Sequence, residues 1–444
     1  MRGNHLGRYH PLMTQPIQAR RLSALLKPEP GRVVIRPFIP SDDPTATTPE
    51  GRSRLGRVVE RILELDEVAL RSEVRRVIAS LSTRNDDVPR ILMRRYHEMG
   101  EAAVEPRLAS EDQALLIGAA LSDEYSFEAA ALFNPSIVPH PDQRGVADGG
   151  LRFVMSLRAV GEGHVSSIIF RTGIFTREAE LRIDPPRAKA ISPRIERIPG
   201  GAAEDPGVRL SFGETHELSA IVIFPVTEYQ RHGIEDLRLV RFEDEDSVSY
   251  LGTYTAFSGE MIRQELFRTT DFANFELSPM RGQVAQTKGM ALFPRRVGGH
   301  YAALGRQDHE SIWLLRSNDL YHWTDGRKII SPRFPWEVVQ IGNCSPPMEI
   351  DEGWLVITHG VGPVRNYCLG ACLLDKQDPG KLLARTAQPI ITPGCEARDG
   401  YVPNVVYTCG GLVHGRSLLL PYSLADTFTV FATFSLDSLL GSMA

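Results

Sequence analysis

From residue 134 to the C-terminus, the sequence is a succession of short β-type runs separated by Gly, Pro and Asp. Clear examples lie at residues 151–157, 165–170, 219–224, 354–358 and 418–422. Short strands at regular intervals, with turn residues between them, indicate an all-β sandwich, barrel or propeller.

A weak internal repeat favours the propeller. Residues 268–275 (RTTDFANF) are echoed by residues 316–323 (RSNDLYHW), so the pattern returns after 48 positions, from residue 268 to residue 316. That period fits one four-stranded blade. The repeat also predicts that Asp271 and Asp319 are turn residues of two blades and not catalytic groups.

The first 130 residues have a different pattern. Residues 56–81, 87–99 and 112–132 place apolar side chains at helical spacing, whereas residues 1–50 are rich in Pro, Arg and Thr and are expected to form an extended arm. We therefore divide the chain into an N-terminal arm and helical extension (1–130) and a β domain (131–444). The extension is either a dimerisation or lid element or a helical cap on the β domain, and the sequence does not separate these roles.

The composition excludes several classes of protein. A net charge of −5 argues against a nucleic-acid binder. The sequence has no run of about 18 apolar residues, so we expect no transmembrane helix. The five cysteines, an odd number, favour free thiols in the cytoplasm over a disulfide framework. The His and Cys spacings do not suggest a metal site, and no phosphate-binding Gly-rich loop suggests a nucleotide, so we expect no cofactor.

The motif at residues 232–238 (HGIEDLR) carries the strongest chemical signal. It places Glu235 and Asp236 at the entry of a predicted strand, two positions before Arg238. Because successive side chains on a strand point to opposite faces, the two carboxylates are expected to face different sides. An aspartate near an arginine suits general acid work, since its surroundings can tune its pKa. A surface turn with an ordinary ion pair is the alternative.

Beyond this motif, the β domain resembles glycoside hydrolase family 130, the inverting mannoside phosphorylases and mannosidases. The resemblance rests on motifs in a common order, namely residues 134–137, 157–159, 233–238, 254–259, 288–294, 319–323, 353–360, 370–375 and 400–406. It implies a five-bladed β-propeller, here with an N-terminal α-helical extension. The extension itself lies outside the resemblance.

The resemblance also implies the roles of several residues. Asp236 takes the place of the family's general acid, although Leu237 replaces the proline of the family's Glu-Asp-Pro-Arg pattern. The family's acid is thought to deliver its proton through a sugar hydroxyl, and phosphate supplies the nucleophile, so a second catalytic carboxylate is not required. The residues that resemble the family's phosphate ligands are Lys288 and Arg306. His359 resembles an active-site histidine of the family, and it and Arg365 are further candidates for binding phosphate.

One position departs from the family. Many of its phosphorylases carry Lys where this chain has Glu349. A carboxylate beside a phosphate dianion costs affinity unless nearby cations offset it. The same carboxylate could instead activate a water and make the enzyme an inverting hydrolase. Glu396 is a second candidate for that base.

The predicted function is therefore cleavage of a small β-mannoside by inorganic phosphate, to give α-mannose 1-phosphate. Its alternatives are hydrolysis and a non-catalytic propeller that binds glycans or proteins. A homodimer through the helical extension is a further expectation, and the sequence gives neither the linkage nor the acceptor sugar. The predicted substrate contacts are Arg158, Glu235, Arg238, Tyr254, Tyr401, Asn404 and Asp426.

Overall fold

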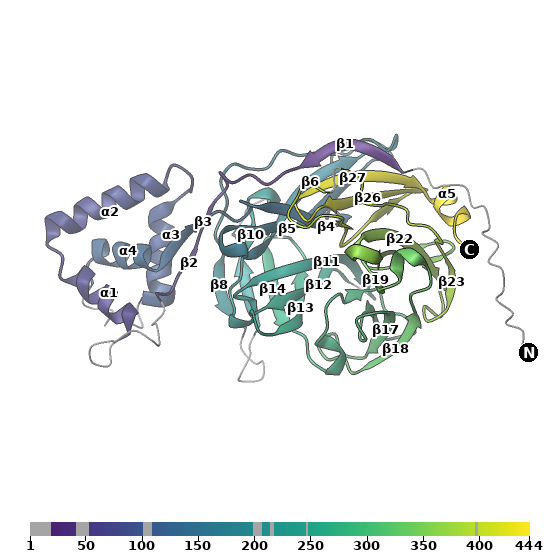
Figure 1. Ribbon diagram of the computed structural model, residues 1–444. Helices are drawn as coiled ribbons and strands as arrows, with labels where there is room; N and C mark the ends of the chain where they lie inside the picture. The colour runs from purple at the N-terminus through teal and green to yellow at the C-terminus, as the bar shows by residue number, and fades with distance from the viewer. Residues whose placement is uncertain are drawn as a thin grey trace, which may run out of the picture.

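The protein consists of a small helical module beside a larger β domain (Figure 1). The computed structural model describes residues 19–40, 53–100, 109–198, 207–213, 217–245, 247–395 and 398–444. The helices of the module are α1 (Arg54–Leu63), α2 (Glu67–Leu81), α3 (Val88–Arg95), which continues as a π-helical turn (Tyr96–Gly100), and α4 (Glu111–Ala120). None of the helices within these ranges is both long enough and apolar enough to cross a membrane.

The helical module differs from its sequence prediction at two points. Residues 56–81 were predicted as one helical stretch, but Asp66 interrupts it: its carboxylate accepts hydrogen bonds from the Val68 and Ala69 amides (3.0 and 2.9 Å) and starts α2. The helix predicted over residues 112–132 ends at Ala120. Strand β3 (Ser122–Tyr125) follows and pairs with β2 (Val34–Pro37).

A buried ion cluster lies where the chain passes from the module to the β domain. The Glu128 carboxylate lies between the guanidinium groups of Arg32 and Arg171, and all three side chains are almost fully buried. Because an unpaired buried charge is costly, each member of this cluster depends on the others. The cluster fixes the entry of the chain into the first sheet.

In its described residues, the β domain forms five separate antiparallel sheets. The first sheet contains β4 (Ala131–Pro139), β5 (Leu151–Val160), β6 (Ser166–Phe175), β7 (Leu181–Ile183) and β10 (Val222–Ile223). The second contains β8 (Arg194–Arg197), β9 (Val208–Ser211), β11 (Gly233–Asp244), β12 (Ser247–Phe257), β13 (Ile262–Thr269) and β14 (Asn274–Pro279). The third contains β15 (Ala291–Leu292), β16 (Tyr301–Gly305), β17 (Ile312–Ser317) and β18 (Asp325–Ile330).

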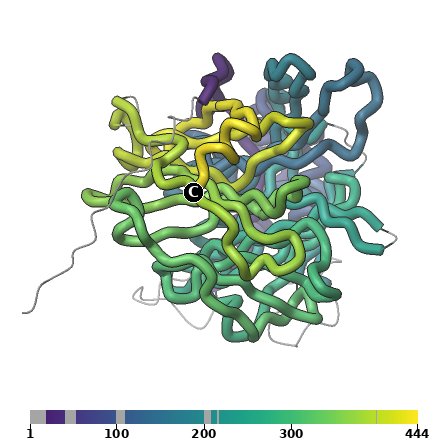
Figure 2. Tube along the Cα trace, turned by 90° about the vertical axis from the view of Figure 1, so that its right-hand side faces the viewer, coloured from purple at the N-terminus to yellow at the C-terminus, as the bar shows by residue number. Residues whose placement is uncertain are grey.

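The last two sheets complete the domain. The fourth contains β19 (Gln340–Asn343), β20 (Met348–Ile350), β21 (Gly353–Val361), β22 (Tyr367–Leu374) and β23 (Leu382–Arg385). The fifth contains β24 (Val406–Tyr407), β25 (Leu412–His414), β26 (Ser417–Leu424), β27 (Phe428–Ser435) and, from the other end of the chain, β1 (Arg20–Leu26). A short helix, α5 (Leu436–Gly441), follows β27. Figure 2 shows β1 in purple against the yellow C-terminal strands.

Successive sheets pack face to face over apolar clusters. One buried cluster joins the first and second sheets, another the second and third, another the third and fourth, and another the fourth and fifth. A further cluster joins the fifth sheet back to the first, and β4 contacts both β11 and β26. The sheets therefore contact one another in a cyclic order, from the first to the fifth and back to the first.

The predicted repeat is confirmed as a structural repeat. Asp271 lies in the turn between β13 and β14, and Asp319 lies in the turn between β17 and β18, which are equivalent positions in neighbouring sheets. Asp271 accepts hydrogen bonds from the Ala273 and Asn274 amides, and Asp319 accepts one from the Tyr321 amide. Both aspartates close their turns, as predicted.

The N-terminal arm contributes more to the β domain than its sequence suggested. The range 1–130 was assigned to the arm and helical extension, but β1 from this range pairs along β27. Residues 1–18 and 41–52 of the arm lie outside the described residues.

Candidate active site

The candidate site is built on two irregular strands that begin the first and second sheets. Asp236 on β11 has φ 57°, and the pairing of β11 with β12 shifts register between Glu235 and Arg238. Asn134 on β4 has φ 49°, beside a similar register shift. A left-handed backbone is unfavourable for residues other than Gly, and such strain concentrates at functional sites.

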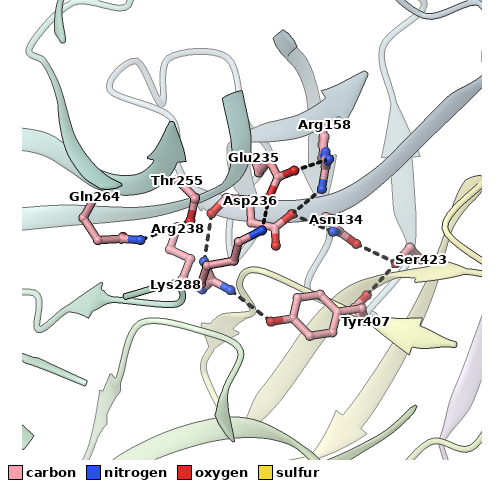
Figure 3. Close-up of polar contacts among 10 residues, drawn as sticks. All are labelled: Asn134, Arg158, Glu235, Asp236, Arg238, Thr255, Gln264, Lys288, Tyr407 and Ser423. Atoms are coloured by element: carbon pink, nitrogen blue, oxygen red, sulfur yellow. Dashed lines mark hydrogen bonds and ion pairs between the residues drawn. The ribbon is translucent and has the colours of Figure 1, made fainter. Parts of the chain in front are cut away.

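The bulge corrects the prediction that the two carboxylates face opposite sides of the strand. Arg158 on β5 contacts both of them, through Nη2 to Glu235 Oε1 (2.9 Å) and Nη1 to Asp236 Oδ1 (3.3 Å) (Figure 3). Strict alternation of side chains holds only for a regular strand, and the left-handed Asp236 turns its side chain toward that of its neighbour. The two acids therefore belong to one site.

Lys288 forms an ion pair with one of the two acids, Glu235. Its Nζ lies 2.8 Å from Glu235 Oε2. The segment before Lys288 is held by Gln264 on β13, which donates to Thr287 O (2.7 Å) and to Thr255 Oγ1 (3.1 Å). Figure 3 shows the amine of Lys288 beside Asp236, with a dashed line to Glu235.

Asp236 is hydrogen-bonded on the side opposite to Lys288. Asn134 Nδ2 donates to Asp236 Oδ1 (2.7 Å), and Ser423 Oγ on β26 donates to Asn134 Oδ1 (3.0 Å). Burial by itself would raise the pKa of Asp236, but the charges of Arg158, Arg238 and Lys288 and the Asn134 hydrogen bond outweigh it and lower the pKa. Asp236 is thus a carboxylate whose proton affinity depends on its cations.

Arg238 supports the site from behind. It is fully buried and donates to Cys344 O, Tyr407 Oη and the backbone oxygen of Asp236, each at 3.0 Å. These contacts tie β11 to the fourth and fifth sheets and hold the bulge in place. This corrects the prediction that Arg238 contacts substrate, because its donors are directed to protein oxygens.

Arg306 lies close to Lys288. A side chain on Gly289, the residue after Lys288, would meet Arg306 Nε at 3.0 Å. Arg306 Nε is buried and has no hydrogen-bond partner in the described part of the chain. Arg306 therefore packs against the residue that follows Lys288, and its guanidinium keeps an unsatisfied donor.

The His359 ring contacts the Arg306 guanidinium. Its Nε2 is 3.3 Å from Arg306 Nη1, and its Nδ1 is 3.4 Å from Cys344 Sγ. Burial, together with the charges of Arg306 and Arg238, lowers the pKa of His359 far below its ordinary value, so the ring is neutral. The prediction that His359 itself binds phosphate is corrected: the side chain is fully buried and contacts the cation instead.

Asp426 is the third carboxyl group of the site. It follows Ala425 at the end of β26 and has φ 50°. Burial and the negative charge of Asp236 raise the pKa of Asp426 to about 6, against the opposing charges of Arg158 and Arg365. The two aspartates thus have environments that move their pKa values in opposite directions.

The other predicted contacts are divided between the rim of the site and the core. Tyr401 is exposed and stacks on His164, with ring centroids 5.6 Å apart, while Asn404 holds the nearby backbone by accepting from the Tyr367 amide (3.0 Å). Tyr254 is fully buried, and its hydroxyl contacts Gln230 and Glu265. The prediction that Tyr254 contacts sugar is therefore wrong.

Glu349 lies away from the site. It forms a two-pronged ion pair with Arg295, Nε to Oε2 at 2.7 Å and Nη2 to Oε1 at 2.8 Å. This pair lines a cavity of about 270 Å³ together with Arg241 and Glu243, near the far end of β11 from Asp236. The hydrogen bonds from Arg295 lower the pKa of Glu349. Its prediction as the catalytic base is wrong, and Glu396, the other candidate base, lies outside the described residues.

Several residues of the site were not singled out from the sequence. Asn134 belonged to a motif but had no role, and Ser423, Tyr407, Gln340 and Cys344 carried no signal of their own. Their roles arise from contacts between sheets, which a sequence pattern does not encode. Among the described residues, no group of three or more His, Cys, Asp or Glu side chains is arranged to hold a metal ion.

Comparison with known proteins agrees with this geometry. A profile of glycoside hydrolase family 130, described as beta-1,4-mannooligosaccharide phosphorylase, matches residues 207–444, more than half of the chain. The protein therefore belongs to glycoside hydrolase family 130, a family of enzymes.

Two curated relatives and one solved structure are similar to parts of the chain. A 1,2-beta-oligomannan phosphorylase of Thermoanaerobacter sp. is 35% identical over 45% of this chain and 68% of its own length. A beta-1,2-mannobiose phosphorylase of Listeria innocua is 33% identical over 46% of this chain and 58% of its own length. The solved structure of Beta-1,2-Mannobiose phosphorylase from Listeria innocua has a TM-score of 0.50 and 23% identity, over 70% of this chain and 92% of that one, which shows a shared fold.

Proposed function

We propose that the protein is an inverting mannoside phosphorylase, which cleaves a short β-mannoside with inorganic phosphate and releases α-mannose 1-phosphate. The observation that carries the proposal is that Lys288 lies beside the Glu235–Asp236 pair, while Arg306 packs against Gly289, the residue after Lys288. The family profile carries a 1,4 linkage in its description, but we propose a 1,2-linked substrate because both curated relatives carry that linkage in their names.

We also propose that the five sheets are the blades of a five-bladed β-propeller. Their cyclic order of contacts and the apolar cluster between the fifth and first sheets support this architecture. In a propeller, the first strand of each blade lines a central channel. Asp236 and Asn134 lie on two such strands, and the substrate would enter the channel at their end.

Phosphate fits the cations of the site. Guanidinium and ammonium groups bind phosphate oxygens through strong, charge-assisted hydrogen bonds. Arg306 Nε brings a buried donor with no protein partner in the described ranges, and Lys288 Nζ is half-exposed beside Glu235. In the reaction, a phosphate oxygen bonds to the anomeric carbon as the glycosidic bond breaks from the opposite face.

Asp236 supplies the proton to the leaving oxygen, directly or through a sugar hydroxyl. The cations that lower the pKa of Asp236 include Lys288, and a phosphate dianion bound there offsets that positive charge. Binding of phosphate therefore raises the proton affinity of Asp236 and prepares it as an acid. The co-substrate and the acid are coupled through one set of cations.

Hydrolysis is the less favoured reaction, because Glu349 is occupied by Arg295 at the far end of β11. We further propose that the protein acts in the cytoplasm, because its five cysteines are free thiols, which favour a reducing compartment; they are Cys344, Cys368, Cys372, Cys395 and Cys409. A homodimer through the helical module remains a proposal, which sedimentation of the full chain can test.

The proposed reaction is tested by incubating the full chain with β-1,2-mannobiose in the presence and absence of inorganic phosphate. We expect mannose 1-phosphate and free mannose in equal amounts, and turnover that depends on the phosphate concentration. Equal turnover in phosphate-free buffer, with mannose as the single product, would replace phosphorolysis by hydrolysis. Absence of any turnover on 1,2- and 1,4-linked mannosides would favour a binding protein.

A further inference from the structure

Gln340, at the start of β19, lies between the predicted phosphate ligand Arg306 and the buried His359. The orientation of its amide is determined by a backbone carbonyl, His309 O, which can only accept a hydrogen bond. The amide nitrogen therefore faces His309 O (3.3 Å), and the amide oxygen faces Arg306 Nη1 at 2.9 Å and His359 Nε2 at 3.2 Å.

This orientation fixes the direction of every hydrogen bond in the group. Because the Gln340 oxygen accepts from both neighbours, His359 Nε2 carries a proton. In a neutral imidazole Nδ1 is then the acceptor, and it receives the thiol proton of Cys344, whose Sγ lies 3.4 Å away. Burial raises the pKa of the Cys344 thiol to about 12, which keeps that proton on sulfur.

It also identifies the group that holds Arg306. A protonated His359 Nε2 cannot accept from Arg306, even though the two nitrogens are 3.3 Å apart. The Gln340 oxygen is the acceptor within reach of Nη1. The other side of the guanidinium packs against Gly289, and a side chain on Gly342 would meet Arg306 Cδ at 2.5 Å. Among the described residues, Arg306 is thus enclosed by two glycines, and the Gln340 amide oxygen is the acceptor that holds its guanidinium.

We propose that Gln340 is a positioning residue, whose amide oxygen holds the Arg306 guanidinium in the orientation that binds phosphate. His309 O sets the orientation of the Gln340 amide, and His359, held by Cys344, adds a second restraint by donating to the same amide oxygen. This inference rests on the proposed function, and it assigns to three buried or half-buried side chains a role in co-substrate affinity. No proton is transferred along the group during the reaction, since each member keeps its donor and acceptor roles.

The central test is the Gln340→Met variant, which keeps the side-chain length but removes the acceptor. We expect the KM for phosphate, and the Kd for inorganic phosphate measured by calorimetry, to rise about tenfold. The KM for the mannoside, and kcat at saturating phosphate, should stay within about twofold of the wild type. The matched control is Gln307→Met, because Gln307 is next to Arg306 in sequence but donates instead to Val284 O (3.1 Å).

A second pair of variants changes Cys344, the member of the group farthest from Arg306, and leaves Gln340 in place. Cys344→Ser keeps a donor for His359 Nδ1, whereas Cys344→Ala removes it. We expect Cys344→Ala to raise the phosphate KM and Cys344→Ser to restore it to near the wild-type value. A structural role alone would lower thermal stability without this selective rescue.

The outcomes separate the inference from the proposed function. If the wild type binds phosphate and Gln340→Met binds it equally well, or loses phosphate and mannoside affinity together, the positioning role is overturned while phosphorolysis stands. If the wild type neither binds phosphate nor needs it for turnover, both proposals fail.

Discussion

Acidic and basic residues lie near both ends of β11, but their pairing and the backbone around them differ. At the Asp236 end, two carboxylates share Arg158 and Lys288, and the backbone of Asp236 is left-handed. At the other end, Glu349 and Arg295 are paired by two well-formed hydrogen bonds. In the sequence both ends supplied a candidate catalytic carboxylate, Asp236 at one end and Glu349 at the other.

The difference shows what marks a reactive site. A matched ion pair such as Arg295–Glu349 satisfies both partners and leaves nothing for a ligand. The Asp236 end instead keeps a buried guanidinium nitrogen without a protein partner among the described residues, and two aspartates with opposite pKa shifts. Strain, unsatisfied donors and perturbed acids together identify the candidate site, whereas charge alone does not.

The largest effect is expected from Asp236→Asn. Asparagine keeps the shape of the side chain and an oxygen for Asn134 Nδ2, but it has no proton to give to the leaving group. We expect kcat to fall by roughly 10²–10⁴-fold, measured as release of mannose 1-phosphate, with thermal stability and phosphate binding retained. Activity within tenfold of the wild type would remove Asp236 from its role as the acid and abolish the contrast between the two ends.

The next effect is expected from Lys288→Gln, which removes a cation from the Asp236 end. A lost charge-assisted hydrogen bond to phosphate corresponds to roughly a 10–100-fold rise in the KM for phosphate. The KM for the mannoside should change less, because Glu235 keeps its ion pair with Arg158 when Lys288 is replaced. Equal increases in both KM values, measured by initial rates over a grid of the two substrates, would contradict a role in phosphate binding.

Sequence reasoning was most successful where local patterns determine structure. The β-type runs predicted at residues 151–157, 354–358 and 418–422 lie within β5, β21 and β26. The equivalent turns at Asp271 and Asp319 were likewise predicted from a repeat. Each of these features is determined by residues that are close to one another in the sequence.

Sequence reasoning failed where distant contacts override the local pattern. Alternation along β11 placed Glu235 and Asp236 on opposite faces, but a bulge brings both to Arg158. Tyr254 and Arg238 were chosen for their residue types, which suit sugar binding, yet both are fully buried between sheets. Glu349 was chosen for its alignment with a family lysine, and only the structure shows that Arg295 pairs with it.

A smaller effect is expected from Asp426→Asn, and it concerns pH. The negative charge of Asp236 helps to raise the pKa of Asp426 to about 6, and by reciprocity Asp426 raises the pKa of Asp236. Removing Asp426 should therefore lower the pKa of Asp236, and a general acid with a lower pKa loses its proton at a lower pH. We expect the alkaline limb of the kcat/KM profile to move down by roughly half a unit to one unit. A shift to higher pH would contradict this electrostatic coupling.

Asp426→Asn should also change how the free energy of unfolding depends on pH. A carboxyl group whose pKa is raised by folding binds its proton more tightly in the folded state, so the free energy of unfolding falls as pH rises from about 4 toward 6 and is flat above that range. Asp426→Asn should remove this local loss, and the variant should gain stability relative to the wild type above pH 6. Urea unfolding at pH 4 and pH 7 measures the difference.

The smallest effect is expected from Glu349→Gln, at the other end of the strand. Its ion pair with Arg295 is partly exposed, so its loss should lower the free energy of unfolding by roughly 1 kcal/mol or less. Phosphorolysis should stay within about twofold of the wild type, because Glu349 touches neither the acid nor the cations that converge on it. The companion Arg295→Gln should match it in both readouts, since each removes one half of the same pair. If Glu349→Gln instead lost activity to the extent expected for Asp236→Asn, the two ends would be chemically coupled, and the Glu349 end would have to be counted as part of the reactive site.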